Sequence, residues 1–289
     1  MKQLLAYFYN INNIDIYRYK EYCYFYYKEH KYELKILNRR KNIDEIYNTL
    51  KQTGYDRFYN KIVLNKYLRT VTSYNGKEYI LLRIQDIKNN NIADRIINNN
   101  QIIYSSPIVH TNWKELWQKK IDYFEYHLPN IKYKYKILYE SMEYYIGLAE
   151  TAIAYLSNNN YTNDLYIVHE RITSEPVDYF NPLNIVIDSK SRDVGEYLKM
   201  IFYNSNDYLA KSIDFCNKLK LTNNEYILLI ARLIYPSYFF DVYEDIINEK
   251  RKEKEIIRII SLNNKYIEYL KKIYNHIKNK ANIPTVDWL

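Results

Sequence analysis

Two short apolar runs in the second half of the chain each lead into side chains that could do chemistry. The run 165–168 is followed by His169, and the run 184–187 is followed by Asp188. Imidazole and carboxylate groups serve as general acids and bases, and carboxylates also bind hard metal ions. In the first half, Lys35 has apolar neighbours that alternate as on a strand, and Glu45 on the following helical segment could pair with it.

Most nucleotide and metal motifs are absent from the sequence. With only 4 Gly in 289 residues, neither the G-x-G-x-x-G nor the G-x-x-x-x-G-K-[ST] phosphate loop occurs. Cys23 and Cys216 are the only cysteines, and they lack the spacing of a zinc site or of a disulfide framework. We therefore expect both thiols to be small buried side chains.

The composition is basic and rich in tyrosine. The formal charge is +8, and 37 Tyr stand against 9 Phe. This charge permits an anionic partner, but AT-rich codons enrich Lys, Asn, Ile and Tyr together and explain the composition better. We expect most tyrosines to be packing residues. No signal peptide and no apolar run long enough to cross a membrane is evident, so we expect a cytoplasmic protein.

The first part of the chain is predicted to be rich in strands. Residues 17–27 and 32–37 are predicted strands joined by a charged turn, and 42–53 has helical spacing. Asn75-Gly76 separates two further strands, 68–74 and 78–84, because this pair tolerates the backbone of a tight hairpin turn. The predicted order is strand, strand, helix, strand, strand.

The second part of the chain is mainly helical. Helices are predicted near 113–128, 137–156, 194–203, 208–219, 225–235 and 246–277, with the first ending before Pro129, and the two short β-like runs interrupt them. We predict an α+β fold with a strand-rich small lobe over 1–88, a linker over 89–110 and a larger helical lobe over 111–289. This order is typical of a protein-kinase-like fold.

Four segments carry a more specific resemblance, and they are Trp113–Trp117, Tyr144–Ile153, Ile187–Tyr197 and Ala231–Phe240. In this order they resemble the spore-coat-associated YutH family, relatives of the CotS kinase-like proteins within the aminoglycoside-phosphotransferase-like group. The resemblance extends from about Trp113 to Tyr243, and the first 100 residues match in their general plan.

The resemblance implies a two-lobed fold that holds MgATP in active relatives, with a catalytic Asp two positions after the loop histidine and an Asn five positions further on. In this chain His169 matches the histidine, but Arg171 replaces the Asp and Pro176 replaces the Asn. Arg171 stays protonated and cannot accept a proton. Asp188, 17 residues after Arg171, matches the metal-binding Asp, although one carboxylate alone holds Mg²⁺ weakly.

The same resemblance assigns possible nucleotide-binding residues in the small lobe. Lys35 stands where a phosphate-binding lysine would lie, with Glu45 as its partner, although a surface strand lysine explains it better. No glycine precedes Gly54, so a Gly-rich turn over the phosphates is missing.

A substitute base could come from the altered loop, where Glu170, Glu175 and Asp178 lie. For His169 we favour a role in bracing the backbone over general-base catalysis. Arg192 and Asp193 are expected to form a structural ion pair or a helix cap.

We therefore expect a catalytically deficient kinase-like protein that acts as an assembly or regulatory module, associated with the spore coat of an endospore-forming low-GC bacterium. A protein partner is expected, and nucleic acid is not favoured. The alternative is an active ATP- and Mg-dependent phosphotransferase with Asp188 on the metal and Glu170 or Asp178 as base. A third hypothesis is a basic nucleic-acid-binding protein whose aromatic side chains stack on bases.

Overall fold

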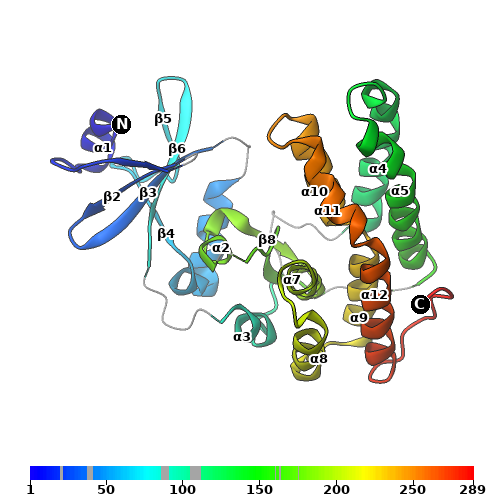
Figure 1. Ribbon diagram of the computed structural model, residues 1–289. Coiled ribbons are helices and arrows are strands. Elements are labelled where there is room, and N and C mark those ends of the chain that lie inside the picture. The colour runs from blue at the N-terminus through cyan, green and yellow to red at the C-terminus, as the bar shows by residue number, and fades with distance from the viewer. Residues whose placement is uncertain are drawn as a thin grey trace. The chain divides into compact units, whose positions relative to one another are not determined.

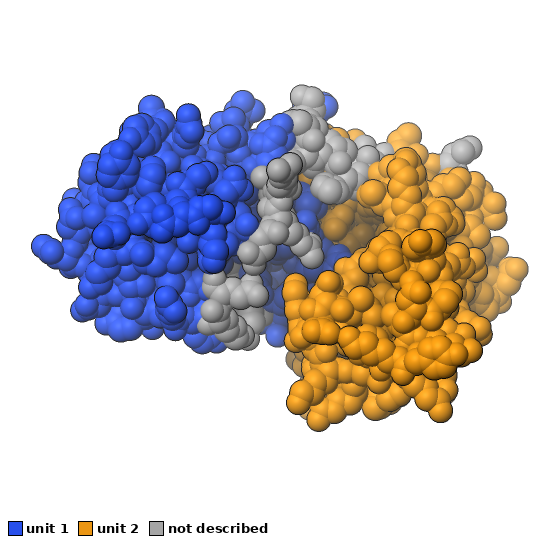
Figure 2. Space-filling view, turned by 90° about the horizontal axis from the view of Figure 1, so that it is seen from above, with its two compact units in different colours: residues 1–92, 104–109, 169–186 blue, residues 93–103, 110–168, 187–289 orange. Residues whose placement is uncertain are grey.

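The fold combines an antiparallel sheet with a larger set of helices (Figure 1). The computed structural model describes residues 1–19, 22–37, 42–85, 91–104, 112–159, 161–162, 164–174 and 176–289. These residues form two compact units, coloured separately in Figure 2. Unit 1 comprises 1–92, 104–109 and 169–186, and unit 2 comprises 93–103, 110–168 and 187–289. The lobe boundaries expected from the sequence stay a prediction, and Glu175 and linker residues 89, 90 and 105–110 lie outside the described residues.

Unit 1 is built on the sheet. Among the described residues, the strands are β1 (Tyr17–Tyr19), β2 (Tyr22–Tyr27), β3 (His30–Ile36), β4 (Lys61–Val63), β5 (Thr72–Tyr74) and β6 (Lys77–Arg83). They pair antiparallel in the order β1-β2-β3-β6-β4, with β5 also pairing with β6. The α+β class expected from the sequence is confirmed. The strand predicted over 17–27 is two strands, because the chain reverses between β1 and β2.

One face of this sheet is covered by an N-terminal helix that the sequence analysis did not predict. Helix α1 (Lys2–Tyr9) buries Leu4 and Leu5 against Phe25, Leu34 and Leu81, whose side chains share one face of the sheet. Burying these side chains removes apolar surface from water, and each contributes about 1.5–3 kcal/mol.

Two local signals in unit 1 produced the predicted structure. Asn75 and Gly76 have φ angles of 50° and 72°, the left-handed values that a two-residue hairpin turn requires. Helix α2 (Ile43–Thr53) begins where the side chain of Asn42 accepts a hydrogen bond from the Glu45 backbone N–H. Both elements therefore follow from short-range chemistry.

Unit 2 is dominated by helices packed on one another. Its longer helices are α4 (Trp113–Ile131), α5 (Lys136–Ser157), α7 (Ser191–Asn204), α8 (Tyr208–Lys218), α9 (Asn223–Ile234), α10 (Ser237–Ile247) and α12 (Asn263–Lys278). The shorter elements within the described ranges are α3 (Ile92–Ile97), α6 (Pro176–Tyr179), α11 (Ile256–Ser261) and the 3₁₀ turns Tyr55–Phe58, Pro182–Asn184 and Glu253–Glu255. The two short β-like runs form a separate two-stranded sheet of β7 (Tyr166–His169) and β8 (Ile185–Asp188).

The predicted end of the first long helix is wrong. Helix α4 does not end before Pro129 but includes it and continues to Ile131. Ile131 is buried, so packing of this last turn outweighs the hydrogen bond that the proline cannot donate. Among the residues that the structure describes, no helix combines the length and apolar character that a membrane crossing requires.

Candidate functional site

Asp188 lies at the end of β8, and its carboxylate is surrounded by donors. The side chain is fully buried. Its Oδ1 accepts a hydrogen bond from the Ser189 backbone N–H at 2.7 Å, and its Oδ2 accepts one from the Trp113 indole N–H at 2.8 Å. Every residue of β8 is buried, so the strand fixes the depth at which this carboxylate lies.

Arg192 supplies the counter-charge of Asp188. It lies four residues further on, in the first turns of α7, and its guanidinium donates to Asp188 Oδ2 at 2.8 Å. The side chain of Arg192 is only 12% exposed, so this ion pair is largely removed from water. Asp188 ends β8 and α7 begins three residues later, so the short connection between strand and helix brings the two groups together. Arg192 therefore forms an ion pair with Asp188, a partner that was not expected from the sequence, where the pair or cap was assigned to Arg192 and Asp193.

Further charged side chains of unit 2 are buried near Trp113. The Arg232 guanidinium lies 4.9 Å from the Trp113 ring and pairs with Glu196 at 2.9 Å. On the other side, Trp113 stacks on Trp117. Three of the four segments that carried the family resemblance thus contribute to one packed core: Trp113 from α4, Asp188 and Glu196 from the third segment, and Arg232 from α9.

Two lysines of unit 2 are also buried. Lys199 Nζ donates to the Tyr235 carbonyl at 2.6 Å and to the Ser237 hydroxyl at 3.0 Å. Lys190 Nζ donates to the Ile97 carbonyl at 2.9 Å. Burial lowers the pKa of the Lys190 ammonium, and a nearby carboxylate opposes this shift. These hydrogen bonds hold helices and loops together, which is a structural use of charge.

These residues do not fit a magnesium ion. Mg²⁺ requires several oxygen ligands in near-octahedral geometry, whereas both oxygens of Asp188 already accept hydrogen bonds. Within the described ranges, no three His, Cys, Asp or Glu side chains cluster closely enough to hold a metal ion. Arg192 provides the positive charge beside Asp188 that a metal ion would otherwise provide.

His169, in unit 1, is a packed residue. It is fully buried, its Nε2 lies 3.1 Å from the Tyr59 hydroxyl, and its ring stacks on Tyr179 at 3.9 Å between centroids. Tyr59 is 110 residues away in sequence, so the histidine ties the altered loop to the sheet-bearing unit. These contacts fit a bracing role.

The loop after His169 is organised by an asparagine that the sequence analysis did not single out. The side chain of Asn184 donates to the carbonyls of Arg171 and Asp178 and accepts from the Arg171 backbone N–H. The Arg171 guanidinium donates to the Glu170 carbonyl at 2.8 Å. Asp178 is exposed and accepts from the Thr173 hydroxyl, and Glu170 is half-buried.

Lys35 and Glu45 are not joined by the structure. The Lys35 ammonium pairs with Glu33 on the same strand at 3.3 Å, and Lys31 approaches the same carboxylate at 3.6 Å. Glu33 is buried, with 1% of its surface exposed. Among the described residues, no ion pair connects Lys35 with Glu45.

Three partners of the predicted site residues could not be expected from the sequence: Tyr59 for His169, Asn184 for the loop, and Trp113 as donor to Asp188. Each lies far along the chain from at least one group that it contacts, so spacing gave no signal. Arg192 differs, because its position four residues after Asp188 is visible in the sequence.

The fold identifies the class of protein to which this chain is similar. The chain is similar in structure to a spectinomycin phosphotransferase solved with ADP and spectinomycin, with a TM-score of 0.57, 12% identity, and coverage of 94% of this chain and 92% of that one. It is also similar to an aminoglycoside phosphotransferase from Alicyclobacillus acidocaldarius (TM-score 0.57, 13% identity, 92% of each chain). A choline/ethanolamine kinase family protein from Mesorhizobium loti matches with a TM-score of 0.56, 9% identity, and 94% and 95% coverage. The fold is that of the kinase-like phosphotransferases.

Residues 2–279 match the family described as "Spore coat putative kinase YutH", and the chain belongs to this family. A curated relative is the endospore coat-associated protein YutH of Bacillus subtilis (strain 168), 27% identical over 207 residues. The match covers 61% of this chain and 61% of that relative. The resemblance drawn from the four sequence segments is confirmed.

Proposed function

We propose that this chain is a catalytically deficient kinase-like protein that acts by binding, as an assembly or regulatory module of the spore coat. The proposal combines the family, which is associated with the spore coat, with the altered chemistry of the positions that serve phosphoryl transfer. Arg171 and Pro176 replace the catalytic Asp and Asn of active relatives, and neither can take over their roles.

The closed surroundings of Asp188 carry this proposal. A carboxylate that binds Mg²⁺ during phosphoryl transfer must present its oxygens to the ion and to the nucleotide phosphates. Asp188 instead accepts from a backbone N–H, an indole and a guanidinium, all within 2.8 Å. Exchanging Arg192 for a metal ion would break an ion pair that is largely removed from water, which is costly.

A kinase-like protein that acts by binding needs a stable fold and an intact surface, and it does not need the catalytic residues. The buried pair Glu196–Arg232 joins α7 to α9, and the pair Asp188–Arg192 joins the end of β8 to the start of α7. Since the curated relative is named as endospore coat-associated, the partners that we propose for this chain are proteins of the spore coat.

A turnover measurement tests the proposal. Purified full-length chain incubated with MgATP is expected to release no ADP above a protein-free blank, in the presence or absence of spore-coat extract. ADP release that disappears in Asp188→Ala would reject the proposal and favour an active phosphotransferase. Because Asp188→Ala removes a buried ion pair, Glu170→Gln and Asp178→Asn serve as milder variants: both groups reach solvent, and loss of turnover in either would identify the substitute base.

A further inference from the structure

The face of the sheet opposite α1 carries an array of tyrosines and lysines. The register pairs Tyr17 with Tyr24 and Tyr19 with Tyr22, and it places Lys35 and Lys31 opposite Tyr22 and Tyr26. Cross-strand partners share a face, and so do residues two apart on a strand. We call this array the tyrosine–lysine face, and its members are Tyr17, Tyr19, Tyr22, Tyr24, Tyr26, Lys31, Glu33 and Lys35.

The tyrosine–lysine face is open to solvent at its β1–β2 side. Tyr17, Tyr19 and Tyr26 are 49%, 51% and 61% exposed, whereas Ile80 and Leu82, further across the same face, are completely buried. Several large exposed aromatic side chains gathered on one strand pair are uncommon on a surface that has no partner. These exposed tyrosines are exceptions to the expectation that most tyrosines are packing residues.

The ring faces of this array are already in contact. Tyr17 stacks on Tyr24 with centroids 5.2 Å apart, and the Lys31 ammonium lies 5.0 Å from the centre of the Tyr24 ring. Likewise Tyr19 packs against Tyr22 at 5.6 Å, and Lys35 lies 5.2 Å from the Tyr22 ring. The phenol hydroxyls, ring edges and ammonium groups of the array can contact a partner without breaking these contacts.

The charged groups of this face carry a net positive charge. Its two lysines, Lys31 and Lys35, flank one carboxylate, Glu33, which is buried between them and is thereby neutralised. One positive charge is therefore left over on the face. A second copy of this chain would bring the same positive charge to the same face, so like-charge repulsion disfavours self-association there.

We propose that the tyrosine–lysine face binds an acidic segment of a partner protein. The carboxylates of that segment accept hydrogen bonds from the phenol hydroxyls and form ion pairs with the lysines. Single-stranded nucleic acid is the less favoured occupant, because bases stack on free ring faces, whereas Tyr17 and Tyr24 stack on each other and ammonium groups lie over the rings of Tyr22 and Tyr24. The proposal rests on the proposed binding function and names the chemistry of the partner.

The test uses the full chain and two labelled probes, oligo-glutamate and oligo-dT, with binding followed by fluorescence anisotropy. Oligo-glutamate is expected to bind at low ionic strength and to weaken as salt is added. The triple variant Tyr17→Phe, Tyr19→Phe, Tyr26→Phe keeps the rings but removes three exposed donors, and is expected to weaken binding about tenfold.

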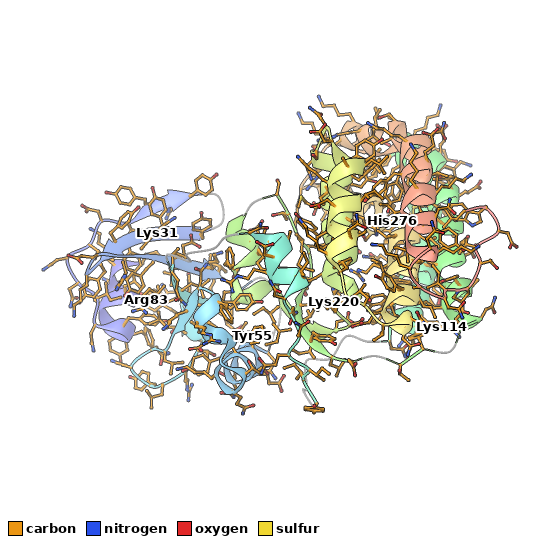
Figure 3. The ribbon with its side chains drawn as sticks, turned by 90° about the horizontal axis from the view of Figure 1, so that it is seen from below. Lys31, Tyr55, Arg83, Lys114, Lys220 and His276 are labelled. Carbon is orange, nitrogen blue, oxygen red and sulfur yellow. The ribbon has the colours of Figure 1, made fainter. Side chains whose placement is uncertain are left out.

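Two matched controls keep the result specific. Tyr123→Phe, Tyr126→Phe, Tyr133→Phe removes three exposed hydroxyls from unit 2 and is expected to leave binding unchanged. A second variant, Lys31→Met with Glu33→Gln and Lys35→Met, removes the ionic trio together so that no buried charge is left unpaired, and is expected to weaken binding. Its charge-matched control is Lys114→Met on α4; Figure 3 labels both Lys31 and Lys114.

Three outcomes would overturn the inference: no binding of oligo-glutamate at low salt, equal loss in the variant and control triples, or binding of oligo-dT in preference to oligo-glutamate. If oligo-glutamate fails to bind while MgATP is also not turned over, the surface is rejected but the catalytic deficiency stands. If oligo-glutamate binds and MgATP is turned over, the binding role of the tyrosine–lysine face stands and the proposed catalytic deficiency is rejected.

Discussion

The ion pair between Asp188 and Arg192 gives the sharpest quantitative prediction. Two unit charges about 4 Å apart attract by about 4 kcal/mol at an effective dielectric constant of about 20. Because Asp188 is fully buried and Arg192 is 12% exposed, little of this attraction is screened by water. Removing one partner leaves the other charge in the interior, so we expect Asp188→Asn and Arg192→Met each to lower the free energy of unfolding by about 3 kcal/mol.

The double variant separates a true ion pair from two independent contributions. With both charges removed, no buried charge remains unpaired, so the loss is expected to be about 3–4 kcal/mol and not the additive value of about 6 kcal/mol. The coupling free energy is therefore about 2–3 kcal/mol. Strictly additive losses would refute the argument that Arg192 neutralises Asp188.

The assay is urea unfolding followed by tryptophan fluorescence. All three tryptophans, Trp113, Trp117 and Trp288, lie in unit 2, so the signal reports on the unit that contains the pair. Asp214 and Lys218 on α8 provide the control, because they have the same i, i+4 spacing and a 2.7 Å contact but side chains that are 67% and 58% exposed. Their cycle, Asp214→Asn with Lys218→Met, is expected to give a coupling below about 1 kcal/mol.

Three further predictions concern single residues. Gly147→Ala in α5 is expected to stabilise the chain by about 0.5–1 kcal/mol, because nothing lies within 4 Å of the added Cβ. Gly195→Ala is expected to destabilise the chain, because its Cβ would lie 3.1 Å from the buried side chain of Arg232. Urea unfolding of the two variants compares these effects. Both cysteines are buried, and burial raises the pKa of the Cys216 thiol to about 12, so a thiol reagent is expected to modify neither Cys23 nor Cys216 before unfolding, and rapid modification of the native chain would contradict this. Burial lowers the pKa of His276 below its usual 6.5, so the unfolded chain takes up the proton more readily. Stability is therefore expected to fall as pH drops from about 7.5 to about 5.5, and the fall should be smaller in His276→Gln.

Local chemistry made part of this fold predictable. The Asn75-Gly76 turn and the capped start of α2 follow from residues within four positions of one another, and the structure contains both. The prediction failed where tertiary packing determines the end of a helix. Helix α4 was predicted to end before Pro129, but burial of Ile131 extends it beyond the proline.

The candidate site was predictable in its residue types but not in its contacts. The sequence shows that Arg171 and Pro176 occupy the places of the catalytic Asp and Asn once the family resemblance is recognised. It does not show that Trp113, 75 residues away, donates to Asp188, since only the packing of α4 beside β8 brings them together. The tyrosine–lysine face was hidden for a related reason, because the register of three strands decides which tyrosines share a face.

The most direct test of the central claim is whether magnesium and ATP together stabilise the chain. A ligand that binds only the native state raises the unfolding temperature by mass action. We predict that the unfolding temperature of the full chain is the same with MgATP, with ATP plus a chelator, and without nucleotide, because Asp188 is already paired with Arg192. A rise in unfolding temperature that requires magnesium and disappears in Asp188→Asn would contradict the account.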